Sequence, residues 1–291
     1  MTTTALVRKA GRNITKRRLS IELYVGLLLM TVVLVCALFG GWISPYNPGD
    51  ASLSNSLLPP GTGHHLLGTN AVGNDMLGLV LAGFRWTGGV GLVATTIAAA
   101  VGTILGILPA VRPGILRRAF TGVINIGILL PVLVIAVTLM TVVGRGFWPM
   151  ALVLGCVGWP TFARVVYGET LSIWERDYVL SARLMGVSTT RIVIRHVFPA
   201  LRQTWLTMFA FMLAVMLIAE ASLSFLGVGA PVGSPDWGLM LANSQTYLTT
   251  APWTFAVPAG AIVLCVLAAN LIGDGIHSTA RLRARRGYSV E

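Results

Sequence analysis

The stretch WTGGVGLVATTIAAAVGTILGILPAV, residues 86–111, decides the fold class of this chain. It contains no Asp, Glu, Lys or Arg, and about 20 mostly apolar residues in a helix are enough to cross the hydrocarbon core of a bilayer. The run lacks the alternation of apolar and polar residues typical of a membrane β-strand, so it predicts a transmembrane helix. Similar charge-free runs cover 23–49, 119–144, 146–163, 203–219 and the end of 237–273.

Trimmed at proline, glycine and polar clusters, these runs predict an all-α membrane protein with six transmembrane helices, at 21–43, 86–108, 119–143, 147–167, 203–226 and 253–276. Of the 291 residues, 55% are hydrophobic and 11% are charged, whereas a soluble domain carries about 25% charged residues. This composition excludes a soluble globular enzyme and a disordered chain. Pro160 is expected to kink the fourth helix.

The basic residues predict the orientation. Of the 21 Lys and Arg residues, 19 fall in the N-terminal tail, the loop after the second helix, the segment between the fourth and fifth helices, and the C-terminal tail; the other two are Arg85 and Arg145. Lys and Arg collect on the cytoplasmic side of a membrane, so both termini are predicted to be cytoplasmic. The net charge of +11 then faces anionic lipid or a protein partner, and nucleic acid is not expected.

These two patterns divide the chain into five parts. They are a basic cytoplasmic tail (1–20), the first transmembrane helix (21–43), an extracytoplasmic loop (44–85), a five-helix core (86–277) that includes a cytoplasmic segment at 168–200, and a basic cytoplasmic tail (278–291). The outer loop can receive substrate or cap the outer mouth of the core. The loop at 227–252 carries Trp237, and with Trp253 beside it can belong to a docking rim or to an interfacial aromatic belt.

Motifs for catalysis are missing from the sequence. The two lysines, Lys9 and Lys16, do not follow a glycine, so the chain has no GxxxxGK[ST] phosphate loop. It has no HExxH zinc motif and no GxSxG nucleophile elbow. No catalytic, cofactor-binding or metal-binding residue is therefore predicted. His64 and His65 are interpreted as solvated loop residues, with a metal site that includes Asp75 as the less favoured alternative.

Two acidic residues of the predicted helices, Glu220 and Asp274, are candidates for the intramembrane ionisable groups that are typical of ion-coupled transporters. Glu220 lies toward the outer end of the fifth helix and can line a substrate path or hydrogen-bond to another helix. Asp274, between Gly273 and Gly275, is interpreted as part of a helix terminus. A proton-coupled secondary transporter, which would depend on these two acids, is therefore kept as an alternative.

The connection at 167–199 is longer than two adjacent spans require. Ser172-Ile-Trp-Glu175 has the form of a capping box and predicts the start of a short helix, which Gly186 can end in a left-handed conformation. Ser188 is predicted to cap a second helix at 189–197 that stops before Pro199. Two such helices can act as a lever seated on a separate motor or as interfacial helices resting on lipid.

Residues 178–199, YVLSARLMGVSTTRIVIRHVFP, resemble the cytoplasmic EAA loop of ABC-importer permeases, including the spacing of thirteen between Gly186 and Pro199. Leu180 and Ser181 stand where that motif has Glu and its first Ala, and Phe198 replaces a Leu. Other segments resemble the C-type permease of bacterial oligopeptide and dipeptide importers, in order and spacing: WISPYNP (42–48), HLLGTNAVGNDML (65–77), AEASLSFLGVG (219–229), PDWGLML (235–241) and NLIGDG (270–275). Nickel-type permeases share much of this pattern.

The resemblance implies a type I ABC-importer permease in the bacterial cell membrane. Its expected partners are a related second permease, P-loop ATPase subunits that bind ATP and Mg, an extracytoplasmic binding protein, a peptide substrate and membrane lipid. It implies that contact with the ATPase is made by Tyr178, Ala182, Arg183, Gly186, Val187, Ser188 and Arg191. The resemblance also implies a translocation path or gate formed by Glu220, Ser222 and Phe225. The loop that faces the substrate or the binding protein would contain His64, His65, Asn70 and Asp75.

Overall fold

The computed structural model describes residues 21–44 and 51–287. Within these ranges the regular structure is helical, and the only β-type pairings are two isolated bridges in the loop before residue 76, Thr62 with His65 and Thr69 with Asp75. The basic tail at 1–20, part of the WISPYNP segment and the last four residues lie outside the described residues. The prediction of an all-α chain is confirmed.

Ten α-helices, three short turns of other helix types and the connections between them make up the described chain. They are α1 (Ile21–Ile43), the 3₁₀ turn η2 (Leu53–Asn55), α2 (Met76–Val111), α3 (Ile115–Leu129), α4 (Val132–Val143), α5 (Phe147–Trp174), α6 (Asp177–Leu184), α7 (Thr189–Ile192), the π-helical turn η3 (Val193–Val197), α8 (Phe198–Phe225), α9 (Trp237–Ser244), the 3₁₀ turn η4 (Gln245–Tyr247) and α10 (Trp253–Gly287).

Five helices in the described chain are long and apolar enough to cross a membrane: α1, α2, α5, α8 with the turns before it, and α10. Neither α3 nor α4 is counted as a crossing by itself, and the two helices are bent by 89° relative to each other. If the bent pair is counted as one crossing, the total is six. The prediction of one helix over 119–143 is therefore wrong. Pro131 has no N–H to continue the helix and holds Leu130 in an extended conformation (ψ 133°).

The second helix begins ten residues earlier than predicted, at Met76, so the predicted loop 44–85 is too long by its last ten residues. Asp75 is the N-cap, and its side chain accepts a hydrogen bond from the Gly78 amide at 2.7 Å. This bond satisfies one of the free amides of the first turn. At 36 residues, α2 is about 54 Å long and extends beyond the hydrocarbon core.

Other helix ends also differ from the predicted ones. α5 continues through Pro160 to Trp174, and α10 reaches Gly287. Asp274 therefore lies inside α10, and its interpretation as part of a helix terminus is wrong. α8 does not begin after a break at Pro199, because α7 and η3 lead into it as one continuous helical segment, Thr189–Phe225.

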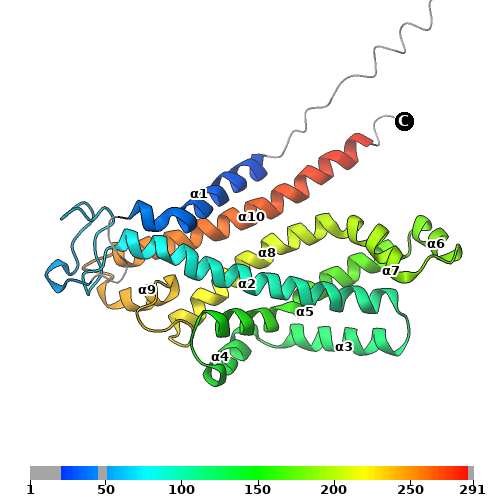
Figure 1. Ribbon diagram of the computed structural model, residues 1–291, viewed down its shortest axis with the longest axis horizontal. Coiled ribbons are helices and arrows are strands. Elements are labelled where there is room, and N and C mark those ends of the chain that lie inside the picture. The colour runs from blue at the N-terminus through cyan, green and yellow to red at the C-terminus, as the bar shows by residue number, and fades with distance from the viewer. Residues whose placement is uncertain (1–20, 45–50, 288–291) are drawn as a thin grey trace, which may run out of the picture.

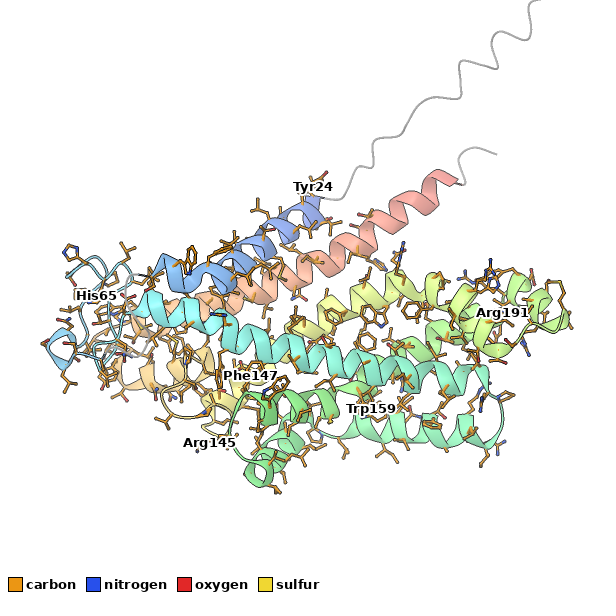
Figure 2. All side chains as sticks on the ribbon, viewed as in Figure 1. Tyr24, His65, Arg145, Phe147, Trp159 and Arg191 are labelled. Carbon is orange, nitrogen blue, oxygen red and sulfur yellow. The ribbon has the colours of Figure 1, made fainter. Side chains whose placement is uncertain are left out.

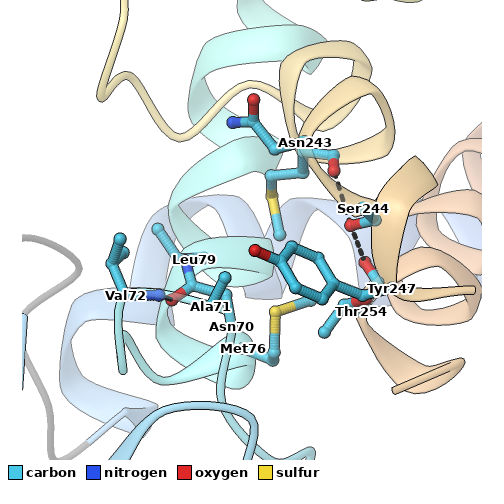
Figure 3. A pocket seen from close by; sticks show the side chains of 10 residues that line it. Asn70, Ala71, Val72, Met76, Leu79, Asn243, Ser244, Tyr247 and Thr254 are labelled. Carbon is cyan, nitrogen blue, oxygen red and sulfur yellow. Dashed lines mark hydrogen bonds between the residues drawn. The ribbon is translucent and has the colours of Figure 1, made fainter. Parts of the chain in front are cut away.

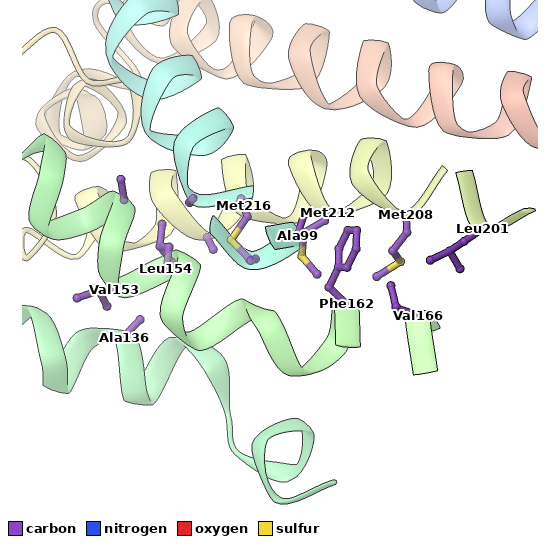
Figure 4. Close-up of a cluster of buried hydrophobic side chains, with 14 of the residues drawn as sticks. Ala99, Ala136, Val153, Leu154, Phe162, Val166, Leu201, Met208, Met212 and Met216 are labelled. Atoms are coloured by element: carbon purple, nitrogen blue, oxygen red, sulfur yellow. The ribbon is translucent and has the colours of Figure 1, made fainter. Parts of the chain in front are cut away.

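The main core lies between α2, α5 and α8 and is lined by Leu154, Phe162, Met212 and Met216, among others (Figure 4). α2 and α5 approach closely because glycines on each helix face the backbone of the other helix. A Cβ on Gly106 would come within 2.7 Å of the Ala163 carbonyl oxygen. Small residues at such contacts are typical of helix packing in membranes, where van der Waals contact is the main attraction.

A second core joins α1, α9, α10 and the N-terminal part of α2 around Val33, Leu81 and Trp237. Figure 1 shows the long helices α1, α2, α5, α8 and α10 running nearly along one axis. The loop before α2 lies at one end together with α9, and α6 and α7 lie at the other end. In Figure 2, His65 and Arg191 mark these opposite ends, and Arg145 lies in the half that contains His65. The two predicted functional regions are therefore separated by the length of the helices.

Candidate functional site

The connection between α5 and α8 forms a compact element at one end of the molecule. α6 ends in a left-handed glycine, Gly186, with φ +78°, as predicted. The Gly186 amide donates to the Arg183 carbonyl at 3.0 Å and the Val187 amide donates to the Ala182 carbonyl at 3.1 Å. This pair of bonds is a Schellman motif, which satisfies the last carbonyls of the helix and reverses the chain.

The start of α6 differs from the prediction. Ser172 lies inside α5, and Glu175 is the C-cap of α5, so the predicted capping box does not form. α6 begins at Asp177 after Arg176, without a side-chain cap. The guanidinium group of Arg183 stacks over the Trp174 ring, 5.0 Å from its centroid, and this cation–π contact holds α6 against the end of α5.

One face of α6 packs inward. Val179 and the 5% exposed Ala182 join the main core, together with Ile192 and Val197 from the following turns. The predicted role of Ala182 as a contact for another protein therefore does not fit its position. Ser188 occupies the N-cap position of α7, as predicted, but its side chain makes no capping hydrogen bond.

The other face of α6, the turn after it and α7 form an exposed surface. We name it the tip surface and define it as Tyr178, Leu184, Met185, Gly186 and Arg191. Leu184 is 81% exposed and Met185 75% exposed, and a Cβ on Gly186 would meet no atom within 4 Å. Exposed apolar side chains beside an exposed cation are typical of a surface that another protein covers.

At the opposite end, the loop before α2 is ordered by a buried pair. His65 Nδ1 donates to Asp75 Oδ1 at 2.9 Å, and both side chains are almost completely buried. His65 is therefore not a solvated residue, whereas His64 is exposed in a left-handed conformation. Within the described ranges, no group of three or more His, Cys, Asp or Glu is arranged to hold a metal ion.

Asn70 lines a pocket of about 340 Å³ between this loop, α9 and the start of α10 (Figure 3). The Asn70 side chain accepts hydrogen bonds from the Val72 and Asn74 amides, so it shapes the loop. The Trp253 indole donates to the Thr69 carbonyl and ties the loop to α10. Trp237 is completely buried, so its side chain belongs neither to an exposed docking rim nor to an interfacial belt, and both predictions for it are wrong.

Glu220 lies in a buried polar cluster that joins α8 to α9. Its side chain is 0% exposed, and neither carboxyl oxygen has a well-formed hydrogen bond with the described chain. Asp236 and Thr87 are close enough to interact with it. Asp236 caps α9 by accepting from the Leu239 amide at 2.8 Å and accepts from the Ser224 hydroxyl at 2.9 Å.

The other two predicted path residues lie elsewhere on α8. Ser222 lines a hollow of about 230 Å³ between α4, α5 and α8, and its hydroxyl donates to the Ile218 carbonyl. Phe225 is exposed at the end of the helix. Glu220 does not line this hollow, so the three residues do not form one site within this chain.

Asp236 and Thr87 are functional candidates that the sequence interpretation missed. An Asp directly before Trp-Gly at the start of a helical stretch is a typical N-cap signal, and it could have predicted the cap of α9. Contact between Asp236 and Glu220 could not be predicted from spacing, because it depends on how the loop after α8 folds back.

Comparison with known proteins shows similarity over most of the chain. The family described as binding-protein-dependent transport system inner membrane component matches residues 102–285, and the N-terminal TM domain of oligopeptide transport permease C matches residues 23–60. A di/tripeptide transport system permease protein of Pseudomonas aeruginosa is 32% identical over 87% of this chain and 85% of its own length. A putative peptide transport system permease protein of Brucella suis is 33% identical over 92% and 88%, and a glutathione transport system permease protein of Escherichia coli is 32% identical over 86% and 82%.

Proposed function

Since the chain belongs to the family of binding-protein-dependent transport inner membrane components, we propose that it forms one half of the translocation pathway of an ATP-driven peptide importer. As a permease subunit of this family it is an inner-membrane protein and has no ATPase domain of its own. ATP and Mg would be bound by separate ATPase subunits. The other partners would be a second, related permease and an extracytoplasmic binding protein.

In this proposal the chain has the type I importer fold with six crossings, in which α3 and α4 together make the third. Both termini and the tip surface face the cytoplasm, and the loop before α2 faces outward. The distribution of charge along the sequence supports this orientation, since 19 of the 21 Lys and Arg residues belong to the two tails, the loop after α2 and the segment from the end of α5 to the start of α8. In this orientation the chain would be divided into two cytoplasmic tails, the first helix, an outer loop and a five-helix core, and the core would begin at Met76 instead of residue 86.

The tip surface carries the proposal, because it has the features of a coupling element. The buried face of α6 and the Schellman turn that follows it fix α6 to the main core. A displacement of α6 would therefore be transmitted to α5 and α8. The exposed Leu184 and Met185 of the tip surface would enter an apolar groove of the ATPase, and Arg191 with Arg183 would pair with acids at the groove's edge. Val187 and Ser188 would form the turn beside them.

Peptide cargo is supported by the relatives, which are named for di/tripeptide, peptide and glutathione transport. His64, Asn70 and the pocket beside Asn70 would belong to the surface that meets the binding protein. His65 and Asp75 would hold that surface in shape. A nickel-type cargo is the alternative, and competition of peptide uptake by unlabelled peptide or by Ni²⁺ distinguishes the two.

The coupling role is tested with Gly186→Glu in the purified importer, reconstituted in liposomes with its partner subunits. The carboxylate would repel the acids proposed in the ATPase groove and fill the open space at Gly186, so ATP hydrolysis should no longer drive peptide uptake. Gly144→Glu is the matched control, because Gly144 also has a positive φ (+94°) and no atom within 4 Å of its Cβ position, but lies in the turn between α4 and α5. Normal uptake by Gly186→Glu would refute the coupling role.

A further inference from the structure

An apolar groove of about 250 Å³ lies between α1, α2, α8 and α10. Its walls include Leu34 of α1, Gly88 and Leu92 of α2, Leu213 of α8 and Cys265 of α10. Leu34 and Leu92 are about half exposed, so the groove is open to the surroundings of the helices. Within a bilayer, an open groove of this composition faces lipid hydrocarbon.

One lining residue is charged. Arg85 stands at one end of the groove, is exposed, and makes no ion pair or hydrogen bond with the part of the chain that the structure describes. A guanidinium group in a transmembrane helix is expensive unless it meets water or an anion. Arg85 is also one of only two Lys or Arg residues assigned to the outer side by the sequence.

The position of Arg85 along α2 gives its depth. The charge-free run of α2, residues 86–111 between Arg85 and Arg112, is about 39 Å long. This is enough to cross the hydrocarbon core, so in the orientation proposed above Arg85 reaches the depth of the outer-leaflet phosphates. Gly88 and Leu92 follow three and seven residues later on the same face of the helix. Leu92 is therefore about 10 Å deeper in the membrane than Arg85.

We propose that this groove binds one anionic phospholipid of the outer leaflet, with its phosphate against Arg85 and one acyl chain over Gly88 toward Leu92. The groove offers one cation at headgroup depth and apolar walls below it, which matches a molecule with one anionic head and an apolar tail. A guanidinium group also donates two parallel hydrogen bonds to a phosphate. A transmembrane helix of the partner permease in this groove would leave the cation against apolar side chains.

The test measures lipid that remains bound to the importer after purification from nanodiscs containing equal amounts of phosphatidylglycerol and phosphatidylcholine, by native mass spectrometry. The unchanged protein should retain phosphatidylglycerol preferentially. Arg85→Gln should lower this preference by about fivefold, the contribution of one cation near an anionic membrane surface, and Arg85→Lys should keep most of it. Arg145→Gln is the matched control, because Arg145 does not line the groove.

A second pair of variants tests the acyl-chain part of the groove without changing its charge. A Cβ on Gly88 would meet no atom within 4 Å, so Gly88→Leu can fill the groove without a clash and should reduce retention of both lipids. Gly122→Leu on α3, which is equally open, should leave retention unchanged. Equal retention of the two lipids by the unchanged protein, unaltered preference in Arg85→Gln, or crosslinking of Arg85→Cys to the partner permease with no lipid bound would each overturn the proposal.

Discussion

At the residue scale, the two buried acids Glu220 of α8 and Asp236, the N-cap of α9, are the side chains whose burial is most costly without partners. Asp236 has two good donors, the Leu239 amide and the Ser224 hydroxyl, whereas Glu220 has none in the described chain. A buried charge without a partner is very costly. A neutral side chain of the same size at position 220 would not carry that cost, and Asp236 and Thr87 lie close enough to interact with it.

Glu220→Gln is therefore expected to keep peptide uptake within about twofold of the unchanged protein, because Gln is a neutral isostere whose amide group can donate a hydrogen bond to the nearby Asp236 carboxylate. Glu220→Lys should abolish assembly, since it would bury a long cation in the same space. Uptake in reconstituted liposomes measures both variants. A proton-coupled transporter would behave differently, because Gln cannot carry the proton, and complete loss of uptake in Glu220→Gln would favour that mechanism.

The His65–Asp75 pair predicts an asymmetry between its two members. Asp75→Ala removes the bond to His65 and also the N-cap of α2, and loss of a cap alone is worth roughly 1 kcal/mol. His65→Ala removes the bond between His65 and Asp75 but leaves Asp75 in place as the N-cap of α2. Thermal unfolding of the purified subunit should therefore give a lower midpoint for Asp75→Ala than for His65→Ala. Equal midpoints would show that the cap contributes nothing.

At the element scale, the close packing of α2 against α5 is the feature most sensitive to a single methyl group. Gly106→Ala places a Cβ 2.7 Å from the Ala163 carbonyl oxygen, and backbone cannot move aside as a side chain can. We expect a loss of about 1–3 kcal/mol, typical of overpacking, seen as a lower thermal midpoint. Gly168→Ala in α5 is the control, because its Cβ position is open and Ala stabilises a helix interior. If both variants unfold at the same temperature, α2 and α5 are not packed this closely.

The sequence predicted helices where apolar runs are long and missed structure where a local signal competed with them. α1 has the predicted bounds because nothing interrupts its run. Asp75 and Pro131 carry clear local signals, a cap and a helix stop, which a prediction from charge-free runs does not include. Ser172 has a capping-box pattern that does not act, because packing of Ile173 and Trp174 in the core extends α5 past it. Contacts such as Glu220 with Asp236 depend on tertiary folding and have no signal in the sequence.

At the scale of the whole molecule, the bend between α3 and α4 decides how many times the chain crosses the membrane. If the pair crosses, the loop after α2 and the tip surface lie on the same side, as their common end of the molecule in Figure 1 supports. If the pair enters and returns on one side, α6 lies opposite that loop and the loop after α8 changes sides as well. The basic residues of the two segments, including Arg117 and Arg191, favour a common cytoplasmic side.

Single cysteines distinguish these two topologies. In a background with Cys36, Cys156 and Cys265 replaced by Ala, Leu66→Cys, Pro113→Cys, Leu184→Cys and Val232→Cys each place a thiol at a position exposed in the described chain. Six crossings predict that a membrane-impermeant maleimide labels Leu66→Cys and Val232→Cys in intact spheroplasts, and Pro113→Cys and Leu184→Cys only after lysis. With five crossings, Leu66→Cys and Leu184→Cys would be labelled from outside and Val232→Cys would be protected. That second pattern would put the tip surface outside the cell, where no ATPase could reach it, and would refute both the orientation and the coupling role proposed for α6.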